Sequence, residues 1–135
     1  EGAEMEAITR QNGLDLIYLL APTSTGERIA TVAAHSRGFI YLVSLTGVTG
    51  ARADLPPELE DFVGRVRKKA KLPLCVGFGV ATPQQARRIA AIADGVIVGS
   101  RLIQLIEEDG TLASLKTFAG GLRRELDMPK NTGRH

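Results

Sequence analysis

Two glycine pairs stand at the ends of apolar runs and have the residue types that a phosphate site needs. Gly77-Phe78-Gly79 closes one run, and Gly99-Ser100 closes the next, directly before a short helical segment that begins at Arg101. Glycine lets backbone N–H groups approach an anion, and the N–H groups and dipole of a helix N-terminus favour negative charge. Either pair alone is typical of a tight strand-to-helix turn. Together, with the short helix after them, they predict a phosphate site.

A long loop rich in threonine and glycine follows an earlier apolar run. It extends from Thr46 to Pro57 and contains the steps Thr46-Gly47 and Thr49-Gly50. A loop with glycines at two possible hinges can close over a ligand and exclude water. A plain surface connection is the alternative, but two Thr-Gly steps near a strand end favour a lid.

No side chains form an evident acid–base or nucleophilic set. Asp15 and Asp94 stand at the starts of apolar runs, opposite to the glycine pairs, and His35 ends a helical segment on that same opposite side. Cys75 lies within an apolar run, as a small core residue does. The sequence contains no Ser-His-Asp set, HExxH motif or Walker motif. We therefore expect the chain to bind a phosphate but to lack the catalytic side chain that would act on the molecule carrying that phosphate.

Four short apolar runs supply the strands that position these loops. Nearly continuous apolar character is typical of parallel strands that are covered on both faces. The runs extend from Leu14 to Ala21, Phe39 to Leu45, Leu74 to Val80 and Gly95 to Gly99.

Helical patterns with clear start or stop signals separate the runs. Ser24 with Glu27, and Thr82-Pro83 with Gln85, have the spacing of a capping box. The apolar spacing predicts four further helical segments. The first ends at Asn12-Gly13, and the second contains Leu59, Phe62, Val63 and Val66. The third runs from Arg101 to Glu108 before a break at Asp109-Gly110, and the fourth runs from Leu112 to Leu126.

Strands and helices alternate at intervals of roughly 20 to 35 residues, which is typical of right-handed βαβ units. Either an open sheet or a barrel fits this order. A (β/α)8 barrel takes about 250 residues, so 135 residues correspond to about four of its eight units. We expect residues 1–135 to form a single unit of the α/β class that is half of such a barrel.

Composition excludes several other classes of function. The net charge of +2 is too small for a nucleic-acid binder. One cysteine cannot form an internal disulfide bond, and two distant histidines cannot complete a zinc site with it. No apolar run approaches the ~20 residues of a membrane span, and the first residues lack the pattern of a secretory signal. We expect a cytoplasmic protein with no metal.

Four motifs, in this order and spacing, closely resemble the tryptophan synthase alpha subunit over nearly the whole chain. They are Leu14-Asp15-Leu16-Ile17-Tyr18-Leu19-Leu20-Ala21-Pro22-Thr23-Ser24-Thr25, Gly38-Phe39-Ile40-Tyr41-Leu42-Val43-Ser44-Leu45-Thr46-Gly47-Val48-Thr49-Gly50, Val76-Gly77-Phe78-Gly79-Val80 and Asp94-Gly95-Val96-Ile97-Val98-Gly99-Ser100. The resemblance implies the C-terminal half of a TIM (β/α)8 barrel, with strands five to eight.

The resemblance also implies an activity and a set of site residues. The family cleaves indole-3-glycerol phosphate by a retro-aldol reaction to indole and glyceraldehyde 3-phosphate without a cofactor, and indole passes to a pyridoxal-phosphate-dependent beta subunit. Carried onto this sequence, the substrate-binding residues are Gly50, Gly79, Gly99 and Ser100 at the phosphate, Tyr41 and Phe78 in the pocket wall, and Thr49 in the lid, where it helps orient a catalytic Asp. Some relatives have Arg where this chain has Leu45, so no polar role is assigned there.

The sequence departs from the family in lacking the catalytic carboxylates. The catalytic Glu and Asp of the family lie on its second and third strand regions, in the half that these 135 residues do not represent, so we expect the isolated chain to be inactive. The edges and inner apolar face of a half-barrel are open, so we expect the chain to dimerise, to recruit its missing half or to aggregate.

Three functions remain open from the sequence. The first is a lyase segment of tryptophan biosynthesis, and the second is a non-catalytic half-barrel that binds phosphate or a partner. The third is another phosphate-handling barrel enzyme, such as an isomerase, that shares only the two phosphate loops. The loop from Thr46 to Gly50 favours the first over the third.

Overall fold

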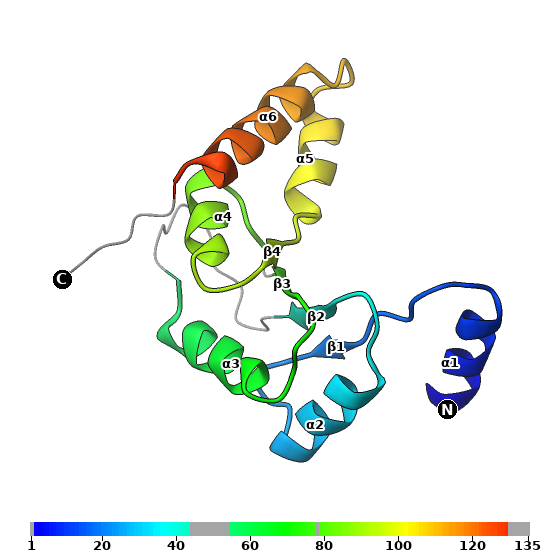
Figure 1. Ribbon diagram of the computed structural model, residues 1–135. Helices are drawn as coiled ribbons and strands as arrows, with labels where there is room; N and C mark the ends of the chain where they lie inside the picture. The colour runs from blue at the N-terminus through cyan, green and yellow to red at the C-terminus, as the bar shows by residue number, and fades with distance from the viewer. Residues whose placement is uncertain (1, 44–54, 78, 130–135) are drawn as a thin grey trace.

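The strands form one parallel sheet. The computed structural model describes residues 2–43, 55–77 and 79–129. Within them β1 (Leu19–Leu20), β2 (Ile40–Val43), β3 (Leu74–Gly77) and β4 (Gly95–Val96) pair side by side in the order β1-β2-β3-β4, and every pair is parallel (Figure 1). The four predicted strands and their parallel arrangement are therefore confirmed.

The strands are shorter than the apolar runs predicted. The run from Leu14 to Ala21 contributes only β1, because this edge strand has a neighbour on one side alone. Leu14 is 61% exposed, and its amide donates to the carbonyl of Thr9 at 2.9 Å, so it belongs to the end of the preceding helix. Apolar content predicts that a segment is covered, but only a hydrogen-bonded neighbour makes it a strand.

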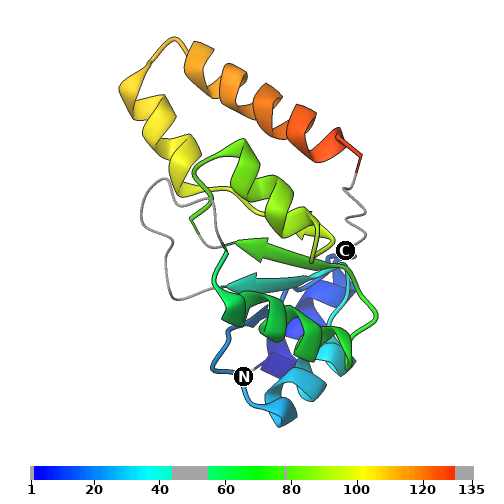
Figure 2. The ribbon, with the colours of Figure 1, turned by 90° about the vertical axis from the view of Figure 1, so that its left-hand side faces the viewer.

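Six helices in the described part of the chain accompany the sheet. They are α1 (Gly2–Gln11), α2 (Gly26–His35), α3 (Pro57–Arg67), α4 (Pro83–Ala90), α5 (Ser100–Glu108) and α6 (Ala113–Asp127). Figures 1 and 2 show α2, α3 and α4 along the outer side of the sheet, with α1 beyond β1 at one end and α5 and α6 beyond β4 at the other. The chain therefore alternates strand and helix as predicted.

The hydrophobic core lies on one face of the sheet only. Alternate strand residues are buried there against helical residues. The strands contribute Leu20, Ile40, Leu42, Leu74 and Val76, and the helices contribute Ile29, Val32, Leu59, Phe62, Val63, Val66, Ala86 and Ile89. The four residues that the sequence placed on one face of the helix at residues 57–67 are all buried, so that prediction is confirmed.

The helix caps confirm one sequence prediction and correct another. Thr82 and Gln85 form the predicted capping box at the start of α4. At α2, however, the N-cap is Thr25, whose hydroxyl accepts from the amide of Arg28 at 3.1 Å. Ser24 instead accepts from the amide of Ala21 at 3.0 Å, because its hydroxyl closes the turn that follows β1. The predicted box at Ser24 and Glu27 is therefore wrong by one residue.

The corner between α5 and α6 is held by Asp109, as the predicted break at Asp109-Gly110 requires. Its carboxylate accepts from the hydroxyl and amide of Thr111 and from the hydroxyl and amide of Ser114. These hydrogen bonds, those of Thr111 first, lower the pKa of Asp109 to about 2. Because they favour the ionised carboxyl, the carboxylate keeps this corner together at neutral pH.

Candidate functional site

The two glycine loops lie at the same edge of the sheet. β3 and β4 are parallel neighbours with Val76 opposite Val96, and the amide of Ile97 continues the ladder to the carbonyl of Val76 at 2.9 Å. Gly79 comes shortly after the end of β3, and Gly99 comes shortly after the end of β4. Parallel strands place their carboxyl ends together, which is where ligands bind in α/β folds. The structure thus brings the two predicted phosphate loops to one edge.

Glycine at position 79 is required by the backbone. Gly79 has a φ of +73°, a left-handed conformation that side chains with a Cβ rarely adopt. It is exposed, and a Cβ built there would meet no atom within 4 Å. Gly79 is therefore an exposed residue at the carboxyl edge of the sheet, in a conformation that favours glycine.

The N-terminus of α5 completes the edge. Gly99 is the N-cap residue and Ser100 is the first helical residue, and both are exposed. The carbonyl of Gly99 accepts from the amides of Leu102 and Ile103, but no side chain caps the helix start. The first N–H groups of a helix have no partner within the helix, so they are available to a negatively charged group.

Tyr41 reaches toward this edge across its neighbouring strand. Its Cα lies opposite Cys75, whereas its hydroxyl oxygen lies 2.6 Å from where a Cβ of Gly77 would stand, two residues nearer the carboxyl end. Gly77 is buried, and its missing side chain leaves the space that the phenol occupies. Tyr41 is thus placed where a pocket wall beside the phosphate loops would be.

Three predicted site residues lie outside the described residues. These are Thr49 and Gly50, in the expected lid, and Phe78, between the two glycines of the third motif. Their roles stay predictions.

The opposite end of the sheet carries a structural ion pair. Arg67, at the end of α3, contacts the Asp94 carboxylate at 2.7 Å, and that carboxylate also accepts from the amide of Leu74 at 2.9 Å. Asp15 faces Arg37 at 3.8 Å on the same side of the sheet. These carboxylates stand at the amino ends of the strands, as the sequence indicated, so neither can reach a substrate at the glycine loops.

Cys75 is half-buried and lies between the core residues Leu74 and Val76 of β3, on the opposite face of the sheet, so the predicted place in the core is wrong. Burial, followed by the nearby Asp94 charge, raises the pKa of its thiol. A Cβ at Gly95 would stand only 2.8 Å from the Cys75 sulfur, so the neighbouring strand holds the thiol closely. A raised pKa disfavours the thiolate, which is the reactive form of cysteine.

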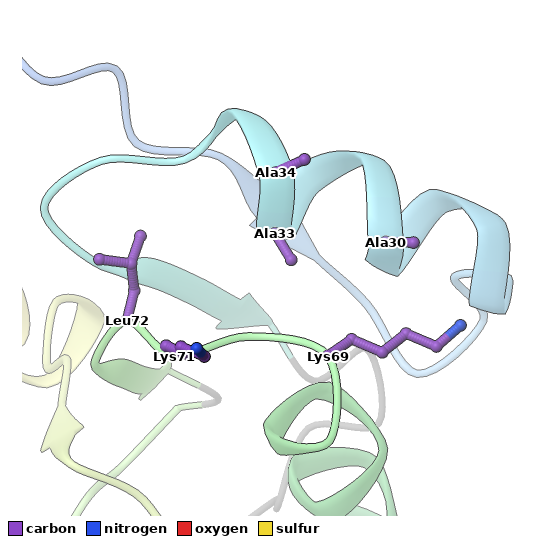
Figure 3. Close-up of a pocket in the computed structure, with 6 residues that line it drawn as sticks. All are labelled: Ala30, Ala33, Ala34, Lys69, Lys71 and Leu72. Carbon is purple, nitrogen blue, oxygen red and sulfur yellow. The ribbon is translucent and has the colours of Figure 1, made fainter.

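A cavity of about 560 Å³ lies away from the glycine loops, between α2 and the segment that follows α3 (Figure 3). Small side chains of α2 (Ala30, Ala33 and Ala34) line it together with Lys69, Lys71 and Leu72. The ammonium of Lys69 donates to the carbonyl of Gly26 at 2.9 Å. The cavity belongs to the outer helical layer and is not part of the candidate site.

Two residues that support the site were not singled out by the sequence. Gly77 appeared only as part of a glycine pair, although its role is to leave room for Tyr41. Gln85 appeared only as a capping residue, although its side chain accepts from the amides of Ala81 and Thr82 and so holds the loop that contains Gly79. A glutamine three residues after a threonine helix start, directly after a glycine loop, is a sequence signal that could have indicated this.

The fold and the site together define a class of protein. Four parallel strands with helices on one face, and two glycine loops meeting an uncapped helix N-terminus at the carboxyl edge, are the arrangement of half a (β/α)8 barrel. A sequence model of the family described as "Tryptophan synthase alpha chain" matches residues 1–125. The chain belongs to the tryptophan synthase alpha chain family.

Individual relatives agree with this assignment. The tryptophan synthase alpha chain of Dehalococcoides mccartyi is 58% identical over 127 residues, which are 94% of this chain and 50% of that relative. The corresponding chain of Geobacter sulfurreducens is 45% identical over 130 residues, 93% of this chain and 49% of that one. The chain therefore spans about half the length of the curated relatives it matches.

Solved structures give the same result for the fold. The chain superposes on a Mycobacterium tuberculosis tryptophan synthase structure with a TM-score of 0.85 and 40% identity, covering 96% of this chain and 48% of that one. An Aquifex aeolicus structure matches with a TM-score of 0.83 and 31% identity, covering 95% and 47%. The prediction of half a (β/α)8 barrel is confirmed.

The described residues carry neither a membrane-spanning helix nor an evident metal site. None of their helices has the length and apolar character that crossing a membrane requires. Nor do they contain a group of three or more His, Cys, Asp or Glu residues that could hold a metal ion.

Proposed function

We propose that this chain is the substrate-phosphate half of a tryptophan synthase alpha-type lyase. The substrate is indole-3-glycerol phosphate, which retro-aldol cleavage converts to indole and glyceraldehyde 3-phosphate in tryptophan biosynthesis. The observation that carries the proposal is the meeting of Gly79, Gly99 and Ser100 at one sheet edge beside Tyr41. That arrangement supplies N–H groups for the phosphate and a wall for the organic part of the substrate.

Each residue has a distinct part in this proposal. The backbone N–H groups at Gly79, Gly99 and Ser100 bind phosphate oxygens, helped by the dipole of α5. Tyr41 contacts the indole portion, together with Phe78. Thr49 and Gly50 belong to a lid that closes over the bound substrate and excludes water.

The two carboxylates at the amino ends of the strands do not supply the chemistry. Asp15 and Asp94 stand at the far end of the sheet, and acid–base catalysis needs a group within hydrogen-bond reach of the moving proton. The proton transfers therefore fall to a Glu and an Asp on the barrel half that these residues do not include. The beta subunit that would receive indole is the proposed protein partner, and the cytoplasm is the proposed location.

A first test measures phosphate binding at the proposed loops. Titration with glycerol 3-phosphate should shift the backbone amide NMR signals of Gly79, Gly99 and Ser100, because these N–H groups face the bound anion. Amides of α3, such as that of Gly64, serve as the internal control and should not move. Unchanged signals at Gly79 and Gly99 in a folded sample contradict the proposal.

A second test separates binding from catalysis. The purified 135-residue chain should release no indole above background. Addition of the N-terminal half of the Dehalococcoides mccartyi relative, as a separate polypeptide, should restore indole release, because that half supplies the proposed carboxylates. Indole release by the chain alone, or a folded mixed complex that binds glycerol 3-phosphate but stays inactive, contradicts this division of labour.

A non-catalytic half-barrel that binds phosphate or associates with itself is the second candidate. The observation that favours it is the inner face of the sheet, which no described helix covers. In the mixture experiment, this candidate predicts phosphate binding with no gain of activity.

A further inference from the structure

One charged side chain stands among the residues that form the two glycine loops. Residues 79–86 and 97–103 contain no Asp, Glu, Lys or His, and Arg101 is their single charged residue. A phosphate ester carries about two negative charges at neutral pH. The N–H groups of a helix start supply only a fraction of one opposite charge. The loops therefore contain one full positive charge that the proposed function has not used.

Arg101 occupies an unusual place for a cation, because it lies in the first turn of α5. The N-terminal end of a helix carries the positive pole of its dipole, so a cation there is unfavourable and an anion is favourable. α5 has no acidic residue in its first turn and no side-chain cap. The first turns of α1, α2 and α3 do carry the expected acids, which are Glu4, Glu27, Glu58 and Glu60. An anion bound beside Arg101 would offset the repulsion at the start of α5.

The backbone beside Arg101 is also open to an anion. The amides of Leu102 and Ile103 donate to the carbonyl of Gly99 at 2.9 and 3.2 Å. Within the described part of the chain, the amides of Ser100 and Arg101 have no acceptor. A phosphate that takes these two N–H groups lies next to Arg101, and the Cα–Cβ bonds of a helix tilt toward its N-terminus. The Arg101 side chain can therefore reach that phosphate.

The present partners of the Arg101 guanidinium hold it weakly. Its Nη1 donates to the side-chain oxygen of Gln104 at 3.3 Å and lies 4.0 Å from the Glu108 carboxylate, the outer limit of an ion pair. The Glu108 side chain is 65% exposed, so water screens this pair. Because exposed ion pairs contribute little, a phosphate at the start of α5 can replace both partners.

We propose that Arg101 is a further phosphate-binding residue, whose guanidinium leaves Gln104 and Glu108 to bind two oxygens of the substrate phosphate. The planar guanidinium matches phosphate geometry with two parallel hydrogen bonds. Glu108 competes with the phosphate for this group. The inference rests on the proposed function, because the phosphate concerned is the one held at Gly79, Gly99 and Ser100, and it makes Arg101 the residue that selects a doubly charged group.

Titration of matched variants with glycerol 3-phosphate tests this role. Arg101→Gln should raise the Kd about tenfold, because a hydrogen bond to a charged group is lost. Arg101→Lys keeps the charge without the planar fork, so it should raise the Kd less. Lys71→Gln is the control, because it removes a cation beside the cavity of the outer helical layer, and it should match the wild type. The NMR signal of Arg101 Nε should shift with the same Kd as the Gly99 amide.

A second pair of variants tests the competition by Glu108. Glu108→Gln should lower the Kd by about twofold, because the guanidinium no longer has a carboxylate to leave. The same substitution in the Arg101→Gln chain should have no effect. This dependence separates competition for Arg101 from a general repulsion between Glu108 and the phosphate.

Stability and kinetics separate phosphate binding from a structural role. Arg101→Gln should leave the urea midpoint unchanged or raise it slightly, because it removes a cation from the start of a helix. In the mixture of the two barrel halves, it should raise KM and leave kcat nearly unchanged, because the phosphate lies outside the bond that breaks. A lower urea midpoint with an unchanged Kd would make Arg101 a structural residue and overturn the inference.

The outcomes distinguish this inference from the proposed function. Amide shifts at Gly79 and Gly99 with the same Kd in the wild type and in Arg101→Gln overturn the inference and leave the proposed function standing. Equal weakening by Lys71→Gln, or an effect of Glu108→Gln that persists without Arg101, also overturns the inference. Unchanged Gly79 and Gly99 signals in the wild type contradict the proposed function, and the role of Arg101 then falls with it.

Discussion

Replacement of Gly77 by alanine should destabilise the protein and displace Tyr41. The new Cβ would stand 2.6 Å from the Tyr41 hydroxyl oxygen, which is closer than real contacts allow, and 3.1 Å from Cζ of the ring, which is tighter than most real contacts. The phenol has to swing away from β3, and overpacking of this kind costs about 1–3 kcal/mol. Urea unfolding should show that loss as a lower transition midpoint.

The same change should reduce activity in the mixture of the two barrel halves. Tyr41 forms the proposed pocket wall, and a misplacement on the order of 1 Å at a reacting site can cost about a hundredfold in rate. We therefore expect kcat/KM to fall by roughly ten- to a hundredfold, while the amide shifts of Gly99 with glycerol 3-phosphate persist.

A helical glycine gives the control for this experiment. Gly64 lies in α3, and a Cβ there would meet no atom within 4 Å. Gly64→Ala should leave stability unchanged or raise it by up to about 1 kcal/mol, because alanine favours a helix. Equal destabilisation by the two substitutions contradicts the argument.

A double-mutant cycle isolates the contact between the two strands. Tyr41→Leu removes the ring that the new Cβ meets, so Gly77→Ala should cost less in that background than in the wild type. The coupling free energy should be on the order of 1 kcal/mol or more, as for other residues in direct contact. Additive effects contradict the geometry.

The sequence predicted those features that depend on local chemistry. The start of α4 follows from Thr82, Pro83 and Gln85 alone, because a hydroxyl, a fixed φ and an amide side chain three residues later satisfy the helix start wherever it lies. The glycine loops were found for the same reason, since Gly79 needs a left-handed backbone and Gly99 begins a helix.

Features that depend on neighbouring strands or helices were not predictable in the same way. The contact of Tyr41 with Gly77 requires the register that sets Tyr41 opposite Cys75, and no local pattern contains that register. The shortening of the first strand depends on β1 being an edge. The contacts of the Glu6 carboxylate with Tyr18 and His35 join α1 to the segment before β1 and to the end of α2. They exist only in the folded chain.

Gln85 links the loop of the site to the stability of the fold, and its loss should be the most destabilising of the substitutions considered. Its side chain is 1% exposed, and its carbonyl oxygen accepts from the amides of Ala81 at 2.8 Å and Thr82 at 3.2 Å. Gln85→Leu keeps the volume but leaves both amides without this acceptor. A fully buried amide without an acceptor costs about 1–3 kcal/mol, and these two amides are partly buried, so we expect a loss of roughly 2–4 kcal/mol.

The neighbouring glutamine and a conservative change provide the controls. Gln84→Leu alters an exposed side chain of the same helix turn and should change the free energy of unfolding by no more than about 0.5 kcal/mol. Gln85→Glu keeps an oxygen acceptor at the third helical position and should retain most of the stability. Because the amides of Ala81 and Thr82 fix the segment that follows Gly79, Gln85→Leu should also weaken glycerol 3-phosphate binding under conditions where the variant is still folded, and Gln85→Glu should largely restore it. A Gln85→Leu chain as stable as the Gln84→Leu chain would show that the loop is held by something other than this side chain.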